Sequence, residues 1–161
     1  MTKTKLLFLM AGALLADQVT KAAALSLLSQ GSPIPVLPSF NLTLGFNEGA
    51  SFGMMGGIMA GKPLWMATLT SALTFALAIM ALRAKHPLER AGFALAVGGA
   101  IGNIIDRLRQ GAVTDFIDFY WRDWHWPTFN VADIAITVGA ALILVASLPA
   151  RRRKEPSLDP S

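Results

Sequence analysis

The chain alternates between long apolar stretches and polar segments, and four of the apolar stretches resemble membrane-spanning helices. They cover residues 6–28, 63–82, 91–108 and 130–150. The second stretch contains no charged residue, and about 20 apolar residues are enough to cross a hydrocarbon core of roughly 30 Å. Since backbone polar groups in lipid must be satisfied within the helix, the pattern predicts a single membrane domain, residues 1–161, built on four helices.

Two longer polar segments, residues 31–62 and 109–128, lie between these helices on the same side of the membrane. Each contains a run with the alternation typical of a short strand, at 40–46 and at 113–120. We therefore expect an all-α membrane protein with a small extracytoplasmic β-rich platform. Four glycines imply tight turns within the first segment, and three tryptophans of the second are typical of an aromatic belt at a membrane surface: Gly49, Gly53, Gly56, Gly57, Trp121, Trp124 and Trp126.

The composition agrees with a membrane protein and excludes several other classes. Of the 161 residues, 53% are hydrophobic and 15% are charged, whereas a soluble domain usually has about 25% charged residues. A soluble chain this short has too little interior to bury so much apolar surface. The absence of cysteine excludes disulfides, thiolate nucleophiles and cysteine-based metal sites.

The basic residues predict the orientation. Nine of the 14 lysines and arginines fall where the four-helix topology brings them to one side of the membrane: Lys3, Lys5, Arg83, Lys85, Arg90 and residues 151–154. The positive-inside rule places that side in the cytoplasm, so both termini are predicted to be cytoplasmic, with a basic tail at 151–161. The net charge of +4 is thus explained by topology and by contact with anionic membrane lipids, and no nucleic-acid partner is expected.

Ionisable and amide side chains occur within and beside the apolar helices, where they are costly unless paired or hydrated. The predicted topology brings them together near the outer membrane surface. Asp133 lies one turn inside an otherwise apolar helix, which solvation alone does not explain. The set comprises Asp17, Lys21, Asn103, Asp106, Arg107, Asp115, Asp118, Asn130 and Asp133.

The spacing of these residues suggests some of their partners. Asp17 and Lys21 are four residues apart on one helix and can form an ion pair, which would stabilise the bundle. Arg107 has two interpretations that the sequence leaves open: it pairs with Asp106, or it binds a lipid phosphate or a peptide carbonyl.

Paired carboxylates at this surface indicate hydrolysis. When two carboxyl groups lie within hydrogen-bond reach of each other, only one of them ionises near neutral pH. The pair then provides a base that activates water and an acid that protonates the carbonyl oxygen or the leaving amine. His86 and His125 are predicted on opposite sides of the membrane and cannot share a metal ion, so we expect neither a metal nor a cofactor. Spacing alone does not select the pair from the four candidates Asp106, Asp115, Asp118 and Asp133.

Three alternatives compete with the hydrolase. A small ion- or proton-coupled transporter would place its polar groups near the membrane midplane and often has an inverted repeat, whereas here the acids cluster toward one face and no repeat is visible. A structural scaffold leaves Asp133 unexplained. The N-terminal segment resembles the start of a cleavable signal peptide, but its apolar character continues to Leu28, which favours a full span.

Five blocks in order along the chain resemble the lipoprotein signal peptidase (type II signal peptidase) family of bacteria. They are Asp17-Gln18-x-x-Lys21, residues 47–53 (NEGASFG), residues 98–107 (GGAIGNIIDR), residues 113–116 (VTDF) and residues 129–133 (FNVAD). The resemblance implies an aspartic endopeptidase of the bacterial cytoplasmic (inner) membrane, with four helices, a β-cradle on the outer face and no cofactor. Its implied substrates are prolipoproteins that carry a diacylglyceryl group on a cysteine, cut just before that cysteine.

The resemblance also implies roles for particular residues. It assigns the catalytic aspartates to Asp115 and Asp133. Residues matching positions that line the substrate site are Asn103, Arg107 and Asn130, and residues matching supporting positions are Asp106, Asp17, Lys21, Asn47 and Gly49. Asp118 has no counterpart in the family pattern.

Overall fold

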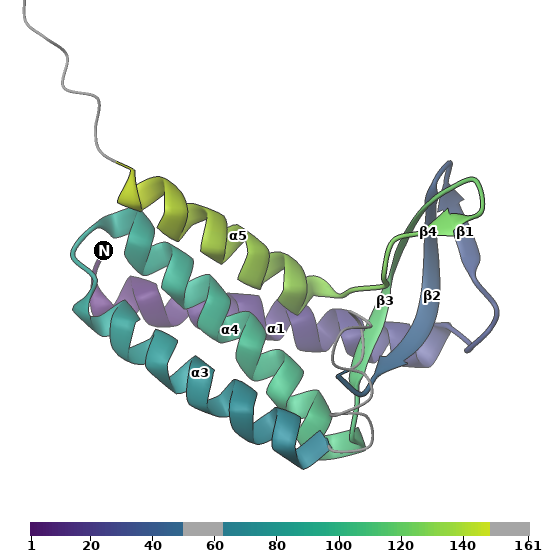
Figure 1. Cartoon of the computed structure of the whole chain (residues 1–161), viewed down its shortest axis with the longest axis horizontal. Coiled ribbons are helices and arrows are strands. Elements are labelled where there is room, and N and C mark those ends of the chain that lie inside the picture. The colour runs from purple at the N-terminus through teal and green to yellow at the C-terminus, as the bar shows by residue number, and fades with distance from the viewer. Residues whose placement is uncertain (50–62, 149–161) are drawn as a thin grey trace, which may run out of the picture.

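The computed structural model describes residues 1–49 and 63–148, which form a bundle of helices with a small antiparallel sheet at one end (Figure 1). The helices are α1 (Lys3–Leu27), α3 (Pro63–Arg83), α4 (Pro87–Gln110) and α5 (Val131–Ser147). The strands are β1 (Ile34–Leu37), β2 (Phe40–Asn47), β3 (Val113–Trp121) and β4 (Trp124–His125), hydrogen-bonded in the order β1-β2-β3-β4. Helix α4 packs against each of the other three helices.

Helix α4 is longer than the predicted span of 91–108 because its ends are defined by local chemistry. Pro87 stands at the start, where its missing N–H costs nothing, and Gly111, with φ 80°, ends the helix by donating its N–H to the carbonyl oxygen of Arg107 at 3.1 Å. Arg90, which the sequence placed in a loop, therefore lies in the helix. Its Nη1 donates to the carbonyl oxygen of Met1 at 2.6 Å.

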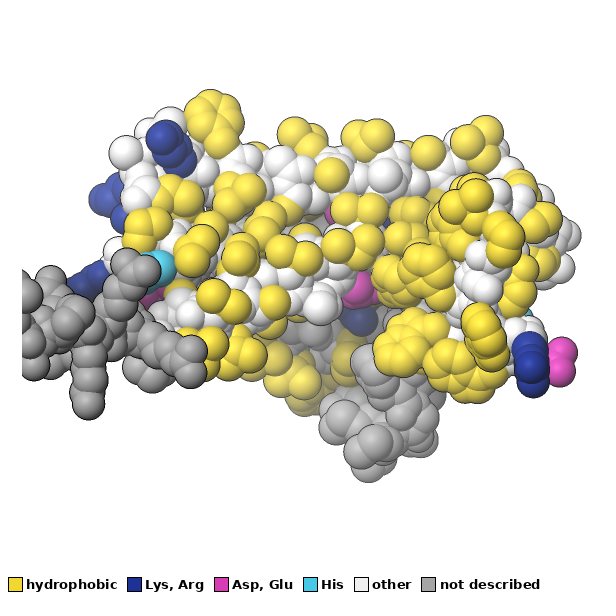
Figure 2. Space-filling view, turned by 90° about the horizontal axis from the view of Figure 1, so that it is seen from above, with side chains coloured by type: hydrophobic (Ala, Val, Ile, Leu, Met, Phe, Trp, Pro, Cys, Tyr) yellow, Lys and Arg dark blue, Asp and Glu magenta, His cyan; other side chains and the backbone are white. Residues whose placement is uncertain are grey.

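Within the described residues, helices α1, α3 and α4 are long and apolar enough to cross a membrane, and α5 is an apolar helix of 17 residues. Their outward surfaces carry large exposed apolar side chains such as Phe8, Leu15, Trp65 and Phe75. Figure 2 shows hydrophobic side chains spread along the sides of the bundle. Such surfaces suit contact with lipid. The predicted end of the fourth span at 150 and the basic tail 151–161 lie outside the described residues.

Glycines allow α4 to pack closely against two neighbours. A Cβ at Gly98 would lie 3.0 Å from the Cβ of Ala13 in α1, and one at Gly99 would lie 2.5 Å from the carbonyl oxygen of Ala132 in α5. Gly102, one turn after Gly98, faces Asp17 of α1. Gly98 and Gly102, spaced as GxxxG, thus act in helix packing.

The β-rich platform is confirmed as a four-stranded antiparallel sheet. The predicted runs 40–46 and 113–120 correspond to β2 and β3, which pair from Phe40 opposite Phe119 to Asn47 opposite Val113. Strands β1 and β4 were not predicted; β1 is an edge strand, where Pro35 is tolerated. Of the turn glycines, Gly49 has a φ of 109°, while Gly53, Gly56 and Gly57 lie outside the described residues.

The sheet lies at the opposite end of the bundle from the described basic residues that the sequence placed on the cytoplasmic side, Lys3, Lys5, Arg83, Lys85 and Arg90 (Figure 1). The N-terminus, the α3–α4 connection and the end of α5 are together at one end, and the sheet is at the other (Figure 1). Figure 2 shows lysine and arginine side chains gathered at the end that is distant from most of the sheet. The amide and carboxylate side chains singled out in the sequence lie toward the sheet end.

Candidate active site

A buried hydrogen-bond network joins α1, α4, β3 and α5 where the bundle meets the sheet. As whole residues, Asp17, Lys21, Asp115 and Asn130 are at most 2% exposed. Such groups are stable in the interior only when they are paired or hydrogen-bonded. The network brings together most of the residues predicted from the sequence, as the following contacts show.

Asn130 and Asp133 form a capping box at the start of α5. The side-chain oxygen of Asn130 accepts from the N–H of Asp133 at 3.0 Å, and Oδ2 of Asp133 accepts from the N–H of Asn130 at 3.2 Å. Asparagine is among the best residues for this position because its oxygen satisfies a free helix N–H. The cap fixes the Asp133 carboxyl group at the start of α5, the end of that helix nearer the sheet (Figure 1).

Asp115 lies in the middle of the site on β3, opposite Gly45 of β2. Its Oδ1 accepts from Nδ2 of Asn130 at 2.6 Å. Burial raises the pKa of the Asp115 carboxyl to about 6, and the charge of Asp133 acts in the same direction. The side-chain amides of Asn130 and Asn47 and the charge of Lys21 oppose this rise in pKa. Asn130 thus links two carboxyl groups from different elements, because its side-chain NH₂ donates to Asp115 and its backbone N–H donates to Asp133.

Asn103 of α4 connects the carboxyl groups to α1. Its Nδ2 donates to Oδ1 of Asp133 at 3.0 Å. Its Oδ1 accepts from Nζ of Lys21 at 2.8 Å and from Nδ2 of Asn130 at 3.3 Å. Helices α1, α4 and α5 are thus connected through the side chain of Asn103.

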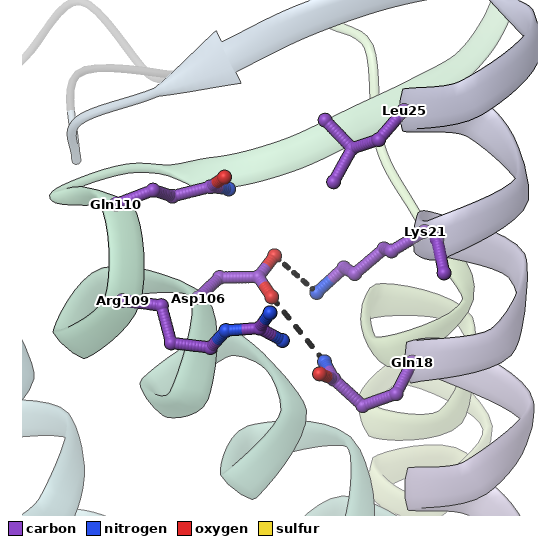
Figure 3. Close-up of a pocket in the computed structure, with 7 residues that line it drawn as sticks. Gln18, Lys21, Leu25, Asp106, Arg109 and Gln110 are labelled. Atoms are coloured by element: carbon purple, nitrogen blue, oxygen red, sulfur yellow. Dashed lines mark hydrogen bonds and ion pairs between the residues drawn. The ribbon is translucent and has the colours of Figure 1, made fainter.

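Lys21 is held by two carboxylates. Its Nζ lies 2.9 Å from Asp17, which confirms the predicted pair within α1, and 3.0 Å from Asp106 of α4 (Figure 3). Asp17 also accepts from the N–H of Ala132 at 2.9 Å, which links α1 to the start of α5. The cluster borders a cavity of about 210 Å³ between α1 and α4.

Of the two interpretations of Arg107, the pair with Asp106 is wrong. Consecutive residues on a helix do not face each other, and Asp106 instead binds Lys21 and accepts from the N–H of Thr114 at 3.0 Å. Within the described residues Arg107 forms no ion pair, and its Nη1 makes a long hydrogen bond of 3.4 Å to the carbonyl oxygen of Asn103. Its guanidinium group is within electrostatic range of Asp133 and Asp115, so it faces the candidate site.

Asp118 belongs to a different cluster. Its carboxylate accepts from Nδ2 of Asn41 at 3.1 Å and lies 2.8 Å from Nδ1 of His125. The three-residue offset from Asp115 puts the two aspartates on opposite faces of β3. Among residues 1–49 and 63–148, no group of three or more histidine, aspartate or glutamate side chains could hold a metal ion.

An apolar cavity of about 560 Å³ opens beside Asp133. Asn47 contributes a polar group to its wall, and its Oδ1 accepts from the N–H of Gly49 at 2.9 Å, which fixes the end of β2. The remaining wall comes from residues 126–129 and from one face of α5, including Ile134 and Val138. A mostly apolar cavity with a few convergent polar groups is typical of a ligand site.

Sequence reasoning missed the contribution of Gln18. Its Nε2 donates to Asp17 at 3.2 Å, to Asp106 at 3.2 Å and to the carbonyl oxygen of Gly102 at 3.3 Å. The residue stands within the first of the five blocks, beside Asp17, but it carries no charge. The signal available in the sequence was an amide on a helix otherwise rich in apolar residues.

Comparison with known proteins gives consistent similarities. Residues 9–149 match the family described as signal peptidase (SPase) II. A lipoprotein signal peptidase of Hydrogenovibrio crunogenus is 43% identical over 143 residues, 86% of this chain and 82% of that protein. One of Histophilus somni is 38% identical over 159 residues, 96% of each chain. A bacterial membrane enzyme solved by the in meso method at 1.9 Å resolution aligns with a TM-score of 0.80 and 30% identity, over 91% of this chain and 94% of that one. These similarities give no support to the transporter hypothesis.

Proposed function

Because the chain belongs to the signal peptidase II family, the aspartic endopeptidases that remove signal peptides from bacterial prolipoproteins, we propose that Asp115 and Asp133 are its catalytic pair. The observation that carries this assignment is their shared partner. Asn130 donates its side-chain N–H to Asp115 and forms the capping box with Asp133. Asp115 is buried and Asp133 borders the apolar cavity, so water and a peptide bond can reach the pair from that side.

In the proposed mechanism the two carboxyl groups share one proton. The pKa of Asp115, raised to about 6 by burial and by the charge of Asp133, favours a state with one acid and one carboxylate near neutral pH. The carboxylate removes a proton from water as the water oxygen bonds to the scissile carbonyl carbon. The acid protonates the carbonyl oxygen, which gives a tetrahedral diol. As the C–N bond breaks, the carboxyl group that took the water proton gives it to the leaving nitrogen, and the other carboxylate takes back a hydroxyl proton as the new C=O bond forms.

The remaining residues of the site orient substrate or hold the pair in place. Asn103 and Asn130 donate to the two carboxyl groups. We assign Arg107, whose guanidinium faces the pair without a carboxylate partner among the described residues, to a peptide carbonyl or a lipid phosphate of the substrate. Supporting positions are taken by Asp17, Lys21, Asp106, Asn47 and Gly49.

The substrate lipid is proposed to bind in the apolar cavity beside Asp133. A diacylglyceryl group carries many methylenes, and each one removed from water contributes about 0.8 kcal/mol. Binding the acyl chains against α5 would place the scissile bond at the carboxyl pair and remove part of the entropic barrier. Membrane lipids are the other expected partners of the exposed apolar helix surfaces.

We further propose that all four helices span the cytoplasmic membrane of a bacterium, with both termini in the cytoplasm and the site on the outer face. The described basic residues at the bundle end, Lys3, Lys5, Arg83, Lys85 and Arg90, support this orientation through the positive-inside rule. The exposed tryptophans Trp121, Trp124 and Trp126 of the sheet end suit the outer interface. The whole chain then forms a single membrane domain.

The experiment that tests the proposed substrate is cleavage in detergent by the purified protein, followed by gel shift. A diacylglyceryl-modified prolipoprotein should lose its signal peptide. The same precursor without lipid, at the same concentration, should be cut far more slowly, because it lacks the group that fills the apolar cavity. Equal cleavage of the two precursors would show that lipid is not part of what the site recognises.

A further inference from the structure

Lys21 is the only lysine or arginine of the described residues that forms ion pairs within the hydrogen-bond network, and all its donor capacity is used there. An ammonium group has three N–H donors and no acceptor. The three acceptors are Asp17 at 2.9 Å, Asp106 at 3.0 Å and Oδ1 of Asn103 at 2.8 Å. The first two contacts neutralise charge, whereas the third reaches a neutral amide that itself contacts the catalytic pair.

The contact with Asn103 fixes which way that amide points. Because Lys21 can only donate, the oxygen of Asn103 must face it, and the NH₂ group must then face Asp133, to which it donates at 3.0 Å. The reverse orientation would place the amide NH₂ against the ammonium group and an oxygen against a carboxylate. Both contacts would be repulsive in an interior where unsatisfied polar groups are costly.

The same constraint extends to the second aspartate. The oxygen of Asn103 also accepts from Nδ2 of Asn130 at 3.3 Å. This contact agrees with the orientation that the capping box gives the Asn130 amide, whose oxygen accepts from the N–H of Asp133 and whose NH₂ group donates to Asp115 at 2.6 Å. Lys21 therefore fixes the hydrogen-bond direction of Asn103, and the contact between the two asparagines joins that direction to the one the capping box gives Asn130.

We propose that Lys21 is a positioning residue of the reaction: by donating to Asn103, it directs the amide N–H of Asn103 onto Asp133 and keeps the Asn103 oxygen facing Asn130, which donates to Asp115. The inference rests on the proposed catalytic pair and adds a cause for its geometry. An ion-pair tether between α1 and α4 would need only the contacts to Asp17 and Asp106. The positioning role needs the third N–H, so the two roles predict different behaviour in a folded variant.

The charge of Lys21 adds a second readout. The charged groups facing Asp115 are Lys21 from α1, Arg107 from α4 and Asp133 from α5. The Lys21 charge opposes the rise in the pKa of Asp115. Removing the Lys21 charge should move the acid limb of the pH–rate profile to higher pH, because a carboxyl group of the pair then ionises only at a higher pH. A tether that acts only on stability leaves this midpoint in place.

The absence of cysteine from the chain allows the ammonium group to be removed and rebuilt at one position. Lys21→Cys introduces a single thiol at the wall of the 210 Å³ cavity, into which the Lys21 side chain points (Figure 3). Alkylation with 2-bromoethylamine restores an ammonium group on a side chain of lysine length. Alkylation with 1-bromopropane gives a neutral chain of the same length.

The assay measures kcat, KM and the pH–rate profile for cleavage of lipidated prolipoprotein, with rates normalised to the amount of folded protein. We expect kcat of the propyl form to fall about 100-fold, the loss typical of misplaced catalytic groups, with KM unchanged and the acid limb at higher pH. The aminoethyl form should regain kcat and the original limb. Arg109→Met, which removes a cation from the same cavity wall outside the network, should match the wild type.

Equal kcat and equal pH profiles for the propyl and aminoethyl forms would overturn the positioning role. If Lys21→Cys does not fold, because Asp17 and Asp106 lose their counter-ion, the comparison is made in Lys21→Cys/Asp106→Asn, which keeps the net charge of the cluster. The proposed catalytic pair is tested separately. If the Asp115→Asn variant cleaves the substrate as the wild type does, the pair is refuted, whatever the Lys21 forms show.

Discussion

Replacing Asp115 by asparagine should inactivate the protein and also stabilise it in neutral and alkaline solution. The native state binds the Asp115 proton more tightly than the unfolded chain does, because burial and the charge of Asp133 raise its pKa from 3.8 to about 6. The stability that comes from this tighter binding is present in full below the unfolded pKa and is lost as the pH rises through about 6. Asparagine does not titrate and keeps an oxygen that can accept from Asn130, so it avoids this loss.

The size of the effect follows from the two pKa values. Each pKa unit corresponds to about 1.4 kcal/mol, so the change in the pKa of Asp115 from 3.8 to about 6 is worth roughly 3 kcal/mol. The side chain is only 2% exposed, so solvent screening reduces this figure little. For a protein of this size, roughly 3 kcal/mol corresponds to a rise in Tm on the order of 10 °C. Functional sites commonly trade stability for activity in this way.

The assay is thermal unfolding of wild type and Asp115→Asn in the same detergent, at pH values from about 4 to about 8. The difference in Tm should be smallest at the acid end and grow as the pH passes the pKa of about 6. If the Tm of Asp115→Asn exceeds that of the wild type by the same amount at every pH, or by less as the pH rises, the reasoning is refuted. The titration belongs to the coupled pair, so Asp133→Asn should alter the wild-type midpoint.

Three further predictions concern the reaction, the orientation and the packing. The pH–rate profile of prolipoprotein cleavage should be bell-shaped, with two apparent pKa values that belong to the pair; a rate that does not fall at alkaline pH would contradict a required acid. Reporter fusions at Lys85 should read cytoplasmic and fusions within residues 31–47 external, and an external reading at Lys85 would reverse the orientation. Gly102→Ala should lower the free energy of unfolding by about 1–3 kcal/mol, because its Cβ would lie 3.0 Å from Cγ of Asp17, whereas Gly12→Ala, with open space around it, should not; thermal unfolding of both variants checks this.

The sequence predicted those parts of the fold that depend on local pattern. Helix positions followed from apolar runs, and strands β2 and β3 from alternation. Strand β1 was missed because the prolines around it argue against a strand, and only pairing with β2 through Ile34 and Leu42 forms it. The predicted start of helix α4, residue 91, lies after its actual start at Pro87. The charged first turn, with Glu89 and Arg90, resembles a loop until Pro87 is recognised as the first helical residue.

Within the site, sequence spacing identified pairs on one helix but not partners between helices. The Asp17–Lys21 pair follows from i,i+4 spacing and is confirmed. One of the two interpretations of Arg107 paired it with its neighbour Asp106, but the partner of Asp106 is Lys21, on another helix. Nothing in the spacing indicates that Asn103 links Lys21 to Asp133, because such contacts depend on how closely α1 and α4 approach at Gly98 and Gly102.

The most direct test of the proposed catalytic pair is the rate of lipidated prolipoprotein cleavage by Asp115→Asn and Asp133→Asn, with Asp118→Asn as the matched control on the opposite face of β3. All three rates are normalised to folded protein in detergent. The two pair variants should lose activity by orders of magnitude, because asparagine keeps the shape of each side chain but can neither remove nor supply the proton. Asp118→Asn, whose parent residue binds Asn41 and His125, should remain active. An inactive Asp118→Asn, with near-full activity in either pair variant, would contradict the assignment.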